Sequence, residues 1–570
     1  MRLNVSKTKN AASFYVIKTI YENGKERTIT VEKLGTENAL REKLNGADPY
    51  EWANNYVKEL NIKEKEQTRE IIVKYSPTKK IEKSDQRLFN GGYLFLQKIY
   101  YDLRIDKICK TIAEKYKFEF DLNSIMSRLI YGRIIYPASK LATHQLSQKF
   151  MEKPNFELHH IYRALEVIAK ETEFIQSELY KNSLTSIKRN TGILYYDCTN
   201  FFFEIEQEDG LKQYGISKEH RPNPIVQMGL FLDGNGIPLA FNISSGNTNE
   251  QITLKPLEQK IISDFNMSKF IVCTDAGLAS TANRKFNDIG NRAFVTAQPL
   301  KKLKDFLKEW SLNPTGWSIP GNNGTYDITC IEEEKYKDTT FYKERWINEN
   351  GLEQRLIVTY SIKYRDYQRT IRQKQLDRAQ KLIDSNPKKL TASNQNDFKR
   401  FITKTSITKD GEIAEKELYM IDSDFIESEE SFDGLYAVCT NLEDAASEII
   451  KINNRRWEIE ESFRIMKSEF KARPVYLKRD DRISAHFTTC FMALMIFRIL
   501  EKKLNEQFTC NEVVEGLRAM DFFKLLGEGY SPAYTRSDFT DLLHDTFAFR
   551  TDYEVVTTNY MKKIFKDTKK

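Results

Sequence analysis

The sequence is poor in the residues that build disulfide frameworks and metal-binding loops. Only 7 of its 570 residues are cysteines, and they lie far apart, with no Cys-x-x-Cys pair and an odd total. This pattern indicates reduced thiols and argues against a disulfide scaffold or a zinc site. Histidine is also scarce. The adjacent His159 and His160 have no cysteine nearby, which disfavours a metal site there.

The chain also lacks a long apolar run. No stretch of about 18 apolar residues is present. The longest candidate, CFMALMIFRIL, is short and contains Arg498. The first residues, MRLNVSKTKN, have no apolar core of the kind found in secretion signals. We therefore expect no membrane partner and a cytoplasmic location.

The residues that are present can build globular cores, and their charges are unevenly placed. Hydrophobic residues make up 40% and aromatic residues 12% of the chain, whose length predicts two to four domains. Residues 1–190 contain 34 Lys and Arg against 24 Asp and Glu, while the remainder contains 54 against 57. Residues 451–500 form a second basic region, with 11 against 6. Two basic regions suit a protein that grips a polyanion, although ordinary solvated surface can look similar.

The first third of the chain is expected to combine a strand hairpin with helices. The stretch FYVIKTIYENGKERTITVEKL contains two strand-like runs around the turn signal Glu22-Asn23-Gly24. Residues 36–75 are helical in pattern and highly charged, and residues 88–190 show the pattern of successive helices. A basic, helical region of this kind is typical of a module that recognises DNA ends, although no specific helix-turn-helix can be assigned.

A different pattern begins at residue 191. Strand-like runs GILYYDCTNFFFE, VQMGLFL and IPLAFNISSG follow one another, with Gly234-Asn235-Gly236 as the turn between the last two. A helix, TLKPLEQKIISDF, and two further strands, KFIVCTDAG and NRAFVTAQ, come next. This order predicts an α/β core with a mixed sheet. Residues 301–433 interrupt that core with a polar block, and residues from 506 onward are expected to form a small helical segment.

Two carboxylates lie on the strands of the predicted core. Asp197 follows the apolar run GILYY, and Asp275 ends the strand FIVCTDAG. Strand ends of α/β sheets are where such folds place their chemistry, and a carboxylate in a buried strand is costly unless it is paired or binds a cation. Each aspartate could instead serve only a local turn, so both interpretations stay open.

A third acidic position lies in RRWEIEESFRIMK. Helical spacing puts Glu460 on one face with Arg456 and Lys467, whereas Glu461 points about 100° away. Ile459, Phe463, Met466 and Phe470 recur at the spacing of a buried face. Taken alone, the stretch also fits an amphipathic surface helix without a catalytic role.

Taken together, these motifs resemble the DDE transposases of bacterial insertion sequences. In the insertion-sequence-four superfamily the third catalytic residue lies in a helix patterned Y-x2-R-x3-E-x6-K. Arg456, Glu460 and Lys467 match this pattern and Trp457 follows the arginine, whereas Asn453 occupies the tyrosine position. The segments TNFFFE, GISKEHRPNPIVQMGLFLDGNGIPLAFNISSGNTNE and VCTDAGLAS look like the group around insertion sequence sixteen-thirty-four. The resemblance covers about residues 190–500.

The resemblance implies a fold, a reaction and a set of site residues. It implies a ribonuclease-H-like core with a strand-containing insertion, and a transposase that cuts the ends of its element and joins the 3′-hydroxyls to target DNA. Catalysis would use Mg²⁺ or Mn²⁺, with two ions per site. The partners would be double-stranded DNA and a second copy of the chain, in a bacterial cytoplasm and on the nucleoid when bound to DNA. The implied catalytic and metal-binding residues are Asp197, Asp275 and Glu460, and the implied DNA-binding residues are Arg456, Trp457, Lys467, Arg464, Lys218 and Arg221.

Six segments and two rival functions complete the prediction. The rivals are a DNA-binding protein that keeps this core without transposing, and a metal-dependent nuclease. The expected segments are an N-terminal hairpin and charged arm (1–75), a helical DNA-binding region (76–190), the first part of the core (191–300), the insertion (301–433), the second part of the core with the Glu460 helix (434–505) and a C-terminal helical segment (506–570).

Overall fold

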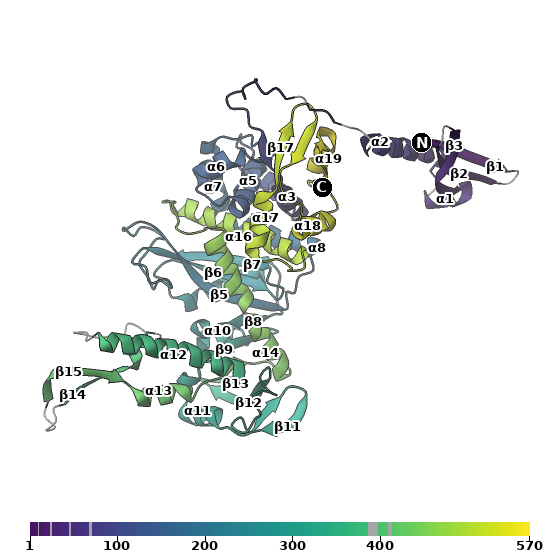
Figure 1. Ribbon diagram of the computed structural model, residues 1–570. Helices are drawn as coiled ribbons and strands as arrows, with labels where there is room; N and C mark the ends of the chain where they lie inside the picture. The colour runs from purple at the N-terminus through teal and green to yellow at the C-terminus, as the bar shows by residue number, and fades with distance from the viewer. Residues whose placement is uncertain are drawn as a thin grey trace. The chain divides into compact units, whose positions relative to one another are not determined.

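The chain forms two compact units. The computed structural model describes residues 1–8, 11–22, 25–44, 47–67, 71–73, 75–385, 397–407 and 413–570. The first unit comprises Met1–Asp85 with Leu525–Glu528, and the second comprises Gln86–Lys524 with Gly529–Lys570. Figure 1 shows the ribbon of both units.

The first unit is a three-stranded antiparallel sheet with helices packed on one face. The predicted hairpin pairs as far as Glu22 and Lys25, with register shifts after Phe14 and after Val16, while its turn at Asn23 and Gly24 lies outside the described residues. A third strand at the very N-terminus was not predicted, and it pairs along the whole of its length. The elements are β1 (Arg2–Thr8), β2 (Ala11–Glu22), β3 (Lys25–Thr36), α1 (Glu37–Lys43) and α2 (Pro49–Gln67).

A mixed sheet of ten described strands runs through the second unit in the order β11-β10-β12-β13-β16-β9-β8-β5-β6-β7. Strands β5, β8 and β9 are parallel to one another, and β6 and β7 continue from β5 as antiparallel hairpins. All nine residues of β6 are buried, as expected of an apolar strand covered on both faces. This half of the sheet comprises β5 (Ile193–Phe202), β6 (Ile225–Asp233), β7 (Pro238–Ser245), β8 (Ile271–Thr274), β9 (Ala293–Ala297) and β16 (Leu435–Thr440), connected by α9 (Leu254–Asp264) and α10 (Thr281–Phe286).

The predicted polar block extends the same sheet. Strand β13 of this block pairs with β16 of the core. The strands β10 to β13 therefore continue the core sheet. A long charged helix and a two-stranded ribbon complete this part (Figure 1). Its elements are α11 (Asp305–Leu312), β10 (Trp317–Ile319), β11 (Asn322–Tyr326), β12 (Thr340–Glu349), β13 (Leu352–Ser361), α12 (Ile362–Asp384), β14 (Ile402–Ile407), β15 (Ile413–Ile421) and α13 (Ser423–Glu430).

Helices from both ends of the second unit share one hydrophobic core. The predicted small helical C-terminal segment is wrong in part, because it also contains strands, one of which pairs with Leu88–Asn90 near the start of the unit. These strands are too short to show period-2 alternation in sequence. The elements are β4 (Leu88–Asn90), α3 (Tyr93–Asp102), α4 (Ile105–Tyr116), α5 (Leu122–Ile135), α6 (Lys140–Ser147), α7 (Leu158–Lys170), α8 (Thr172–Ser186), α16 (Asp480–Lys503), α17 (Cys510–Ala519), β17 (Asp521–Leu525), β18 (Gly529–Pro532), α18 (Asp538–Phe547), β19 (Val556–Thr557) and α19 (Thr558–Asp567).

Helix α16 is long and apolar enough to cross a membrane by length and composition alone. The apolar run CFMALMIFRIL is therefore part of a longer helix than its sequence suggested. The fold accounts for this composition, because 94% of the helix's most apolar window is buried inside the protein. It is the central helix of the core and packs among α3, α5 and α7.

Candidate active site

Asp197 and Asp275 lie side by side on adjacent parallel strands, Asp197 in the middle of β5 and Asp275 directly after the end of β8. The last paired residues of β5 and β8 are Tyr196 and Thr274, and the next residue on each chain is one of these aspartates. Asp275 keeps an extended backbone, with φ −76° and ψ 166°, before a short 3₁₀ turn begins. Since adjacent strands lie about 4.8 Å apart, this register brings the two carboxylates to one edge of the sheet. The structure thus brings together the two predicted aspartates.

Burial of the Asp197 carboxylate is unfavourable for its charged form. Burial raises the pKa of Asp197 to about 6, and the nearby Asp275 carboxylate adds to that rise. Lys218, the backbone N–H of Cys198 and Arg456 act in the opposite direction. The Cys198 N–H donates a hydrogen bond to Asp197 Oδ1 at 2.7 Å. A partly desolvated carboxylate next to a second carboxylate favours the binding of a cation at this edge.

Glu460 reaches the same edge from helix α15 (Trp457–Arg464), which follows α14 (Ala446–Asn454). The Arg456 guanidinium lies between two carboxylates: its Nη1 is 3.2 Å from Asp275 Oδ1, and its Nη2 donates to Glu460 Oε1 at 3.3 Å. Burial lowers the pKa of Arg456, but Asp275, among other neighbours, outweighs this and keeps it above its usual value. Arg456 therefore connects the acidic edge of the sheet to the helix that carries Glu460.

The buried side of α15 is as the periodicity predicts. Ile459, Phe463, Met466 and Phe470 are all buried. Beyond Arg464, however, the chain forms a π-helical turn over Ile465–Glu469, closed by a hydrogen bond from Phe470 N–H to Ile465 C=O at 2.9 Å. The α-helical spacing that was used to place Lys467 on the Glu460 face therefore does not hold through this turn.

Lys467 nevertheless lies near the acidic edge. Its Nζ is 3.7 Å from Glu219 Oε1 and 5.7 Å from the centre of the Phe201 ring. Burial lowers the pKa of Lys467 to about 8, and the charge of Lys218 lowers it further, while Asp197 raises it. The π-turn thus places Lys467 near Asp197.

The loop between β5 and β6 brings Lys218 beside Asp197. Lys218 Nζ donates to the carbonyl of Cys198 and lies 3.0 Å from Glu250 Oε1. Asp197 and Glu250 raise the pKa of Lys218 against the effect of burial. Arg221 is half-exposed and covers the Phe202 ring, with its guanidinium carbon 4.2 Å from the ring centre.

Two more predicted residues are exposed at the two ends of α15. Arg464 forms a bidentate pair with Glu461, at 2.5 and 2.7 Å, and also contacts Glu469 at 3.3 Å. This pairing agrees with the prediction that Glu461 points away from the site. Trp457 is 54% exposed, so it does not pack in the core.

The predicted three-carboxylate ligand set is not assembled in this structure. Among the described residues, no group of three or more His, Cys, Asp or Glu side chains is arranged to hold a metal ion. The physical reason is the Arg456 guanidinium, which pairs with Asp275 and Glu460 and so keeps them from converging with Asp197. The donor chemistry nonetheless suits Mg²⁺ or Mn²⁺, since all three side chains offer carboxylate oxygen. The raised pKa of Asp197 shows the same preference for positive charge.

A buried ion network fixes the Glu460 helix to the core. Glu458 and Arg498 are only 2% and 3% exposed, and Arg498 Nη2 donates to Glu458 Oε2. Arg498 also donates to Glu501 Oε2 at 2.8 Å and to the carbonyl of Gly236 at 3.3 Å. Gly236 has φ +75°, and a Cβ there would lie 2.4 Å from Glu458 Oε2. The β6–β7 turn, α15 and α16 therefore meet at one arginine.

Sequence reasoning missed several residues of this site. Tyr436 on β16 lies close enough to Arg456 and Asp275 for both to influence its pKa, which burial raises. Glu219 contacts both Lys467 and Arg473. Arg498 was noted only as a charge that interrupts an apolar run; a single charge inside such a run is the signal that could have pointed to a buried partner.

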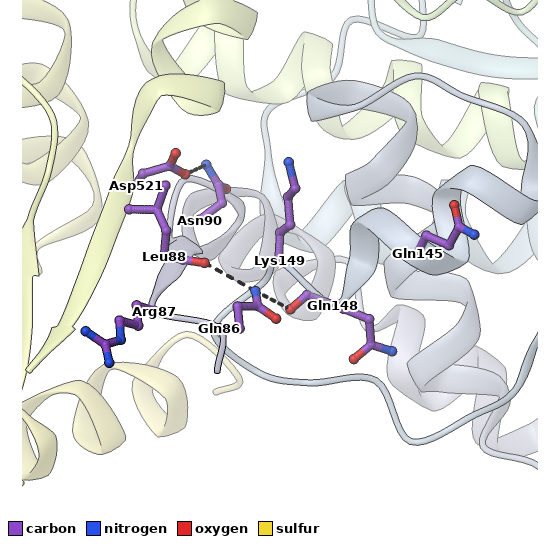
Figure 2. A pocket seen from close by; sticks show the side chains of 8 residues that line it. All are labelled: Gln86, Arg87, Leu88, Asn90, Gln145, Gln148, Lys149 and Asp521. Atoms are coloured by element: carbon purple, nitrogen blue, oxygen red, sulfur yellow. Dashed lines mark hydrogen bonds between the residues drawn. The ribbon is translucent and has the colours of Figure 1, made fainter. Parts of the chain in front are cut away.

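Two open pockets lie away from the acidic edge. One of about 380 Å³ lies where β4 and β17 meet the end of α6, and it shares no lining residue with the acidic edge. In it, Gln86 Nε2 donates to the carbonyls of Leu88 and Gln148, at 3.2 and 3.0 Å (Figure 2). Its remaining lining residues are Arg87, Asn90, Gln145, Lys149 and Asp521.

Comparison with known proteins identifies a family. The sequence model of the family described as Transposase DDE domain matches residues 197–496, just over half of the chain. The match begins at Asp197 and includes Asp275 and Glu460. No curated protein matches the chain.

Two solved structures are similar to the chain at low identity. One is a cryo-EM structure of the piggyBac transposase synaptic complex with hairpin DNA, which is 8% identical, with 85% of this chain and 88% of that chain covered and a TM-score of 0.36. The other is the Mos1 transposase paired-end complex with the left transposon end, which is 12% identical, with 42% and 66% covered and a TM-score of 0.13. Both TM-scores are too low to establish a shared fold.

Proposed function

The chain belongs to the transposase DDE domain family, and we propose that it is a cut-and-paste DNA transposase of a bacterial insertion sequence. It would bind the terminal inverted repeats of its element, cleave the ends and transfer the freed 3′-hydroxyls to target DNA. The observation that carries the proposal is the site where Asp197 of β5 lies beside Asp275 at the end of β8 and Arg456 joins Asp275 to Glu460. The motifs resemble those of the insertion-sequence-four superfamily, in the group around insertion sequence sixteen-thirty-four. The chain would be a member of that group.

The strand order supports a ribonuclease-H-like core. Counted along the chain, the core strands β5, β6, β7, β8 and β9 stand in the sheet in the order third, second, first, fourth, fifth. The first, third, fourth and fifth strands run in the same direction, and the second is antiparallel to them. The proposed division of labour keeps the predicted boundaries, with residues 76–190 binding DNA, 191–300 and 434–505 forming the core, and 301–433 as its insertion.

Asp197, Asp275 and Glu460 would hold Mg²⁺ or Mn²⁺, with two ions per site. When bound, such ions supply an activated water or 3′-hydroxyl and stabilise the leaving oxygen. Arg456 would have to release at least one carboxylate for the three to converge, and its guanidinium would then be free to bind a phosphate as a fork. The arginine thus neutralises the carboxylates in the protein alone and becomes a DNA contact in the complex.

The basic residues would position the DNA backbone around the scissile bond. Lys467 and Lys218 flank Asp197, so both can reach phosphates next to it as point charges. The exposed Trp457 offers a ring on which a base can stack. Arg221 and Arg464 would extend the basic track on either side, with Arg464 giving up its pair with Glu461. A homodimer would hold two element ends together, and the chain would act in the bacterial cytoplasm on nucleoid DNA.

Strand transfer is the test of the proposal. We expect the purified chain, incubated in Mg²⁺ with a labelled duplex carrying the inverted repeats that flank its gene, to release 3′-hydroxyl ends and join them to a plasmid. The measurement is the joined product on a denaturing gel. Cutting without joining would instead identify a metal-dependent nuclease. Binding without cutting would identify a DNA-binding protein that retains the core.

Replacement of Arg456 or Lys467 by Ala should slow cleavage in a graded way. Each loses one charge-assisted phosphate contact, worth about 1.5–3 kcal/mol, or about tenfold to a hundredfold in rate. Lys467→Arg should recover part of the loss, since the charge is kept while the shape differs. Single-turnover cleavage of a labelled element end measures the effect. Lys451→Ala is the control, because Lys451 is exposed and pairs with its helix neighbour Glu448. If both variants cut at the parental rate, the two residues do not position DNA, and α15 is an ordinary amphipathic helix.

A further inference from the structure

The sheet of the N-terminal unit has one covered face and one open face. Alternate residues of β2, namely Ala12, Phe14 and Val16, are buried, and α1 and α2 pack on that side. Tyr56 of α2 also donates to Glu32 of β3, which places Glu32 on the covered side. Both helices described in this unit therefore lie on one face of the sheet, and neither covers the opposite face.

The open face can be read from the strand register. Residues paired across an antiparallel sheet point to the same side. Tyr15 pairs with Asn4 on one side and with Lys33 on the other, and Ile17 pairs with Arg2 and Thr30 in the same way. None of the open-face residues is buried. They are Arg2, Asn4, Ser6 and Thr8 of β1, Ser13, Tyr15, Ile17, Thr19 and Tyr21 of β2, and Glu26, Thr28, Thr30 and Lys33 of β3.

The composition of this face suits a polar partner. Hydroxyl, amide and cationic side chains dominate it, so it is not a core surface that awaits an apolar cover. Lys33 Nζ lies 5.9 Å from the centre of the Tyr15 ring, which leaves the ammonium at the surface. Asn, Ser, Thr and Arg are the side chains that hydrogen-bond base edges, and Lys binds phosphate.

The two layers of this unit differ in charge. The strand region, residues 1–36, contains seven Lys and Arg against three Asp and Glu. The helical region, residues 37–67, contains five against seven. The helical layer is therefore acidic, whereas the open face itself carries two basic residues, Arg2 and Lys33, against one acidic residue, Glu26. This asymmetry favours a polyanion on the open face and disfavours one on the helical face.

The dimensions of the sheet match the major groove of DNA. Three strands spaced about 4.8 Å apart span about 10 Å between the outer strands. The major groove of B-DNA is about 12 Å wide, and some DNA-binding proteins read it with strands. Because no described helix covers the open face, this face can enter the groove with its side chains toward the bases.

We infer that the open face of the β1–β3 sheet reads the major groove of double-stranded DNA at the element end, with Asn4 and Thr30 at base edges and Lys33 on the backbone. The inference rests on the proposed function and refines it, because it places sequence reading on strands and not on the helices of residues 76–190. The helices of residues 76–190 would then contact the phosphate backbone of the DNA and not its bases.

The test uses the full-length chain and a pool of randomised duplexes. The chain first selects its preferred duplex, and fluorescence anisotropy then measures the affinity for that duplex and for a scrambled duplex of equal composition. We expect Asn4→Ala and Thr30→Ala each to weaken binding to the selected duplex about tenfold and to leave the scrambled duplex nearly unaffected. Lys33→Ala should weaken both duplexes equally. Asn55→Ala and Lys58→Ala, at exposed positions of α2, are the matched controls and should change neither affinity.

Several outcomes overturn the inference. If Asn4→Ala and Thr30→Ala bind the selected duplex as the parent does, or if the α2 controls weaken it equally, base reading lies on another surface. If the face variants change the mass of the DNA-free chain in sedimentation, the face is an interface between copies. A parent chain that selects no sequence overturns end recognition as well, whereas a chain that selects a duplex but never cuts it overturns only the proposed chemistry.

Discussion

Single replacement of Asp197, Asp275 or Glu460 by Ala should reduce cleavage of the element end by about a thousandfold or more. The physical reason is that each carboxylate would help to hold the divalent ions, whose stabilisation of the transition state is worth several kcal/mol, and about 4 kcal/mol corresponds to a thousandfold. Binding of the uncut end should stay nearly parental, because affinity for DNA resides mainly in phosphate contacts made by basic side chains. The measurements are single-turnover cleavage in Mg²⁺ and a gel-shift titration of the same duplex.

Glu461→Ala is the matched control for Glu460→Ala. Glu461 is the next residue on the same helix, but its carboxylate is held by Arg464 and not by Arg456. We therefore expect Glu461→Ala to cut at close to the parental rate. Loss of cutting in Glu461→Ala together with normal cutting in Glu460→Ala would show that the assigned side of the helix is wrong. Loss of DNA binding in all three carboxylate variants would mean that these residues maintain the fold and do not serve catalysis.

Much of the acidic edge could be predicted from sequence because it depends on local periodicity. Asp197 and Asp275 each follow an apolar run, and the two runs form neighbouring parallel strands in which the aspartates take equivalent positions. Arg456 and Glu460 are four residues apart on a helix, and the structure confirms that they pair. These relations need only the repeat lengths of strand and helix.

The errors arise where the geometry depends on contacts that are distant in the chain. The π-turn after Arg464 breaks the spacing used for Lys467, and nothing in the local residues indicates it. The strand at Arg2–Thr8 shows only weak alternation and forms because β2 offers it a partner. The strand at Asp521–Leu525 likewise depends on Leu88–Asn90, more than 400 residues earlier in the chain. Pairing of this kind is set by the fold and not by propensity.

The ion network around Arg498 is the clearest case of a long-range requirement, and it carries the second large expected effect. Arg498→Met should lower the free energy of unfolding of the second unit by about 3–5 kcal/mol, since it leaves buried carboxylates without their charged partner. Arg464→Met is the control, because it removes an arginine whose pair with Glu461 is half-exposed and worth about 1 kcal/mol at most. Urea unfolding of the full-length variants, followed by the intrinsic fluorescence of the second unit, measures both changes.

The pH dependence of this loss separates charge from packing. Burial raises the pKa of Glu501 to about 7, and Arg498 holds it below the value that burial alone would give. A carboxyl whose pKa is raised by folding is protonated in the native state at low pH, so its stability cost appears as pH rises through that pKa. Without Arg498 the native pKa of Glu501 should rise further. The destabilisation by Arg498→Met should therefore be smaller at pH 5.5 than at pH 8.

A second variant decides what the network contributes to the site. Arg498→Met combined with Glu458→Leu and Glu501→Gln removes the buried charges together, and replacing a whole buried ion network by apolar or neutral groups is often nearly neutral for stability. If stability returns but cleavage stays low, the network is needed to hold α15 where Arg456 and Glu460 meet the strand ends. If stability and cleavage return together, the role of Arg498 is to neutralise its buried neighbours. A loss in Arg498→Met that is independent of pH would show that the arginine acts through its volume and not through its charge.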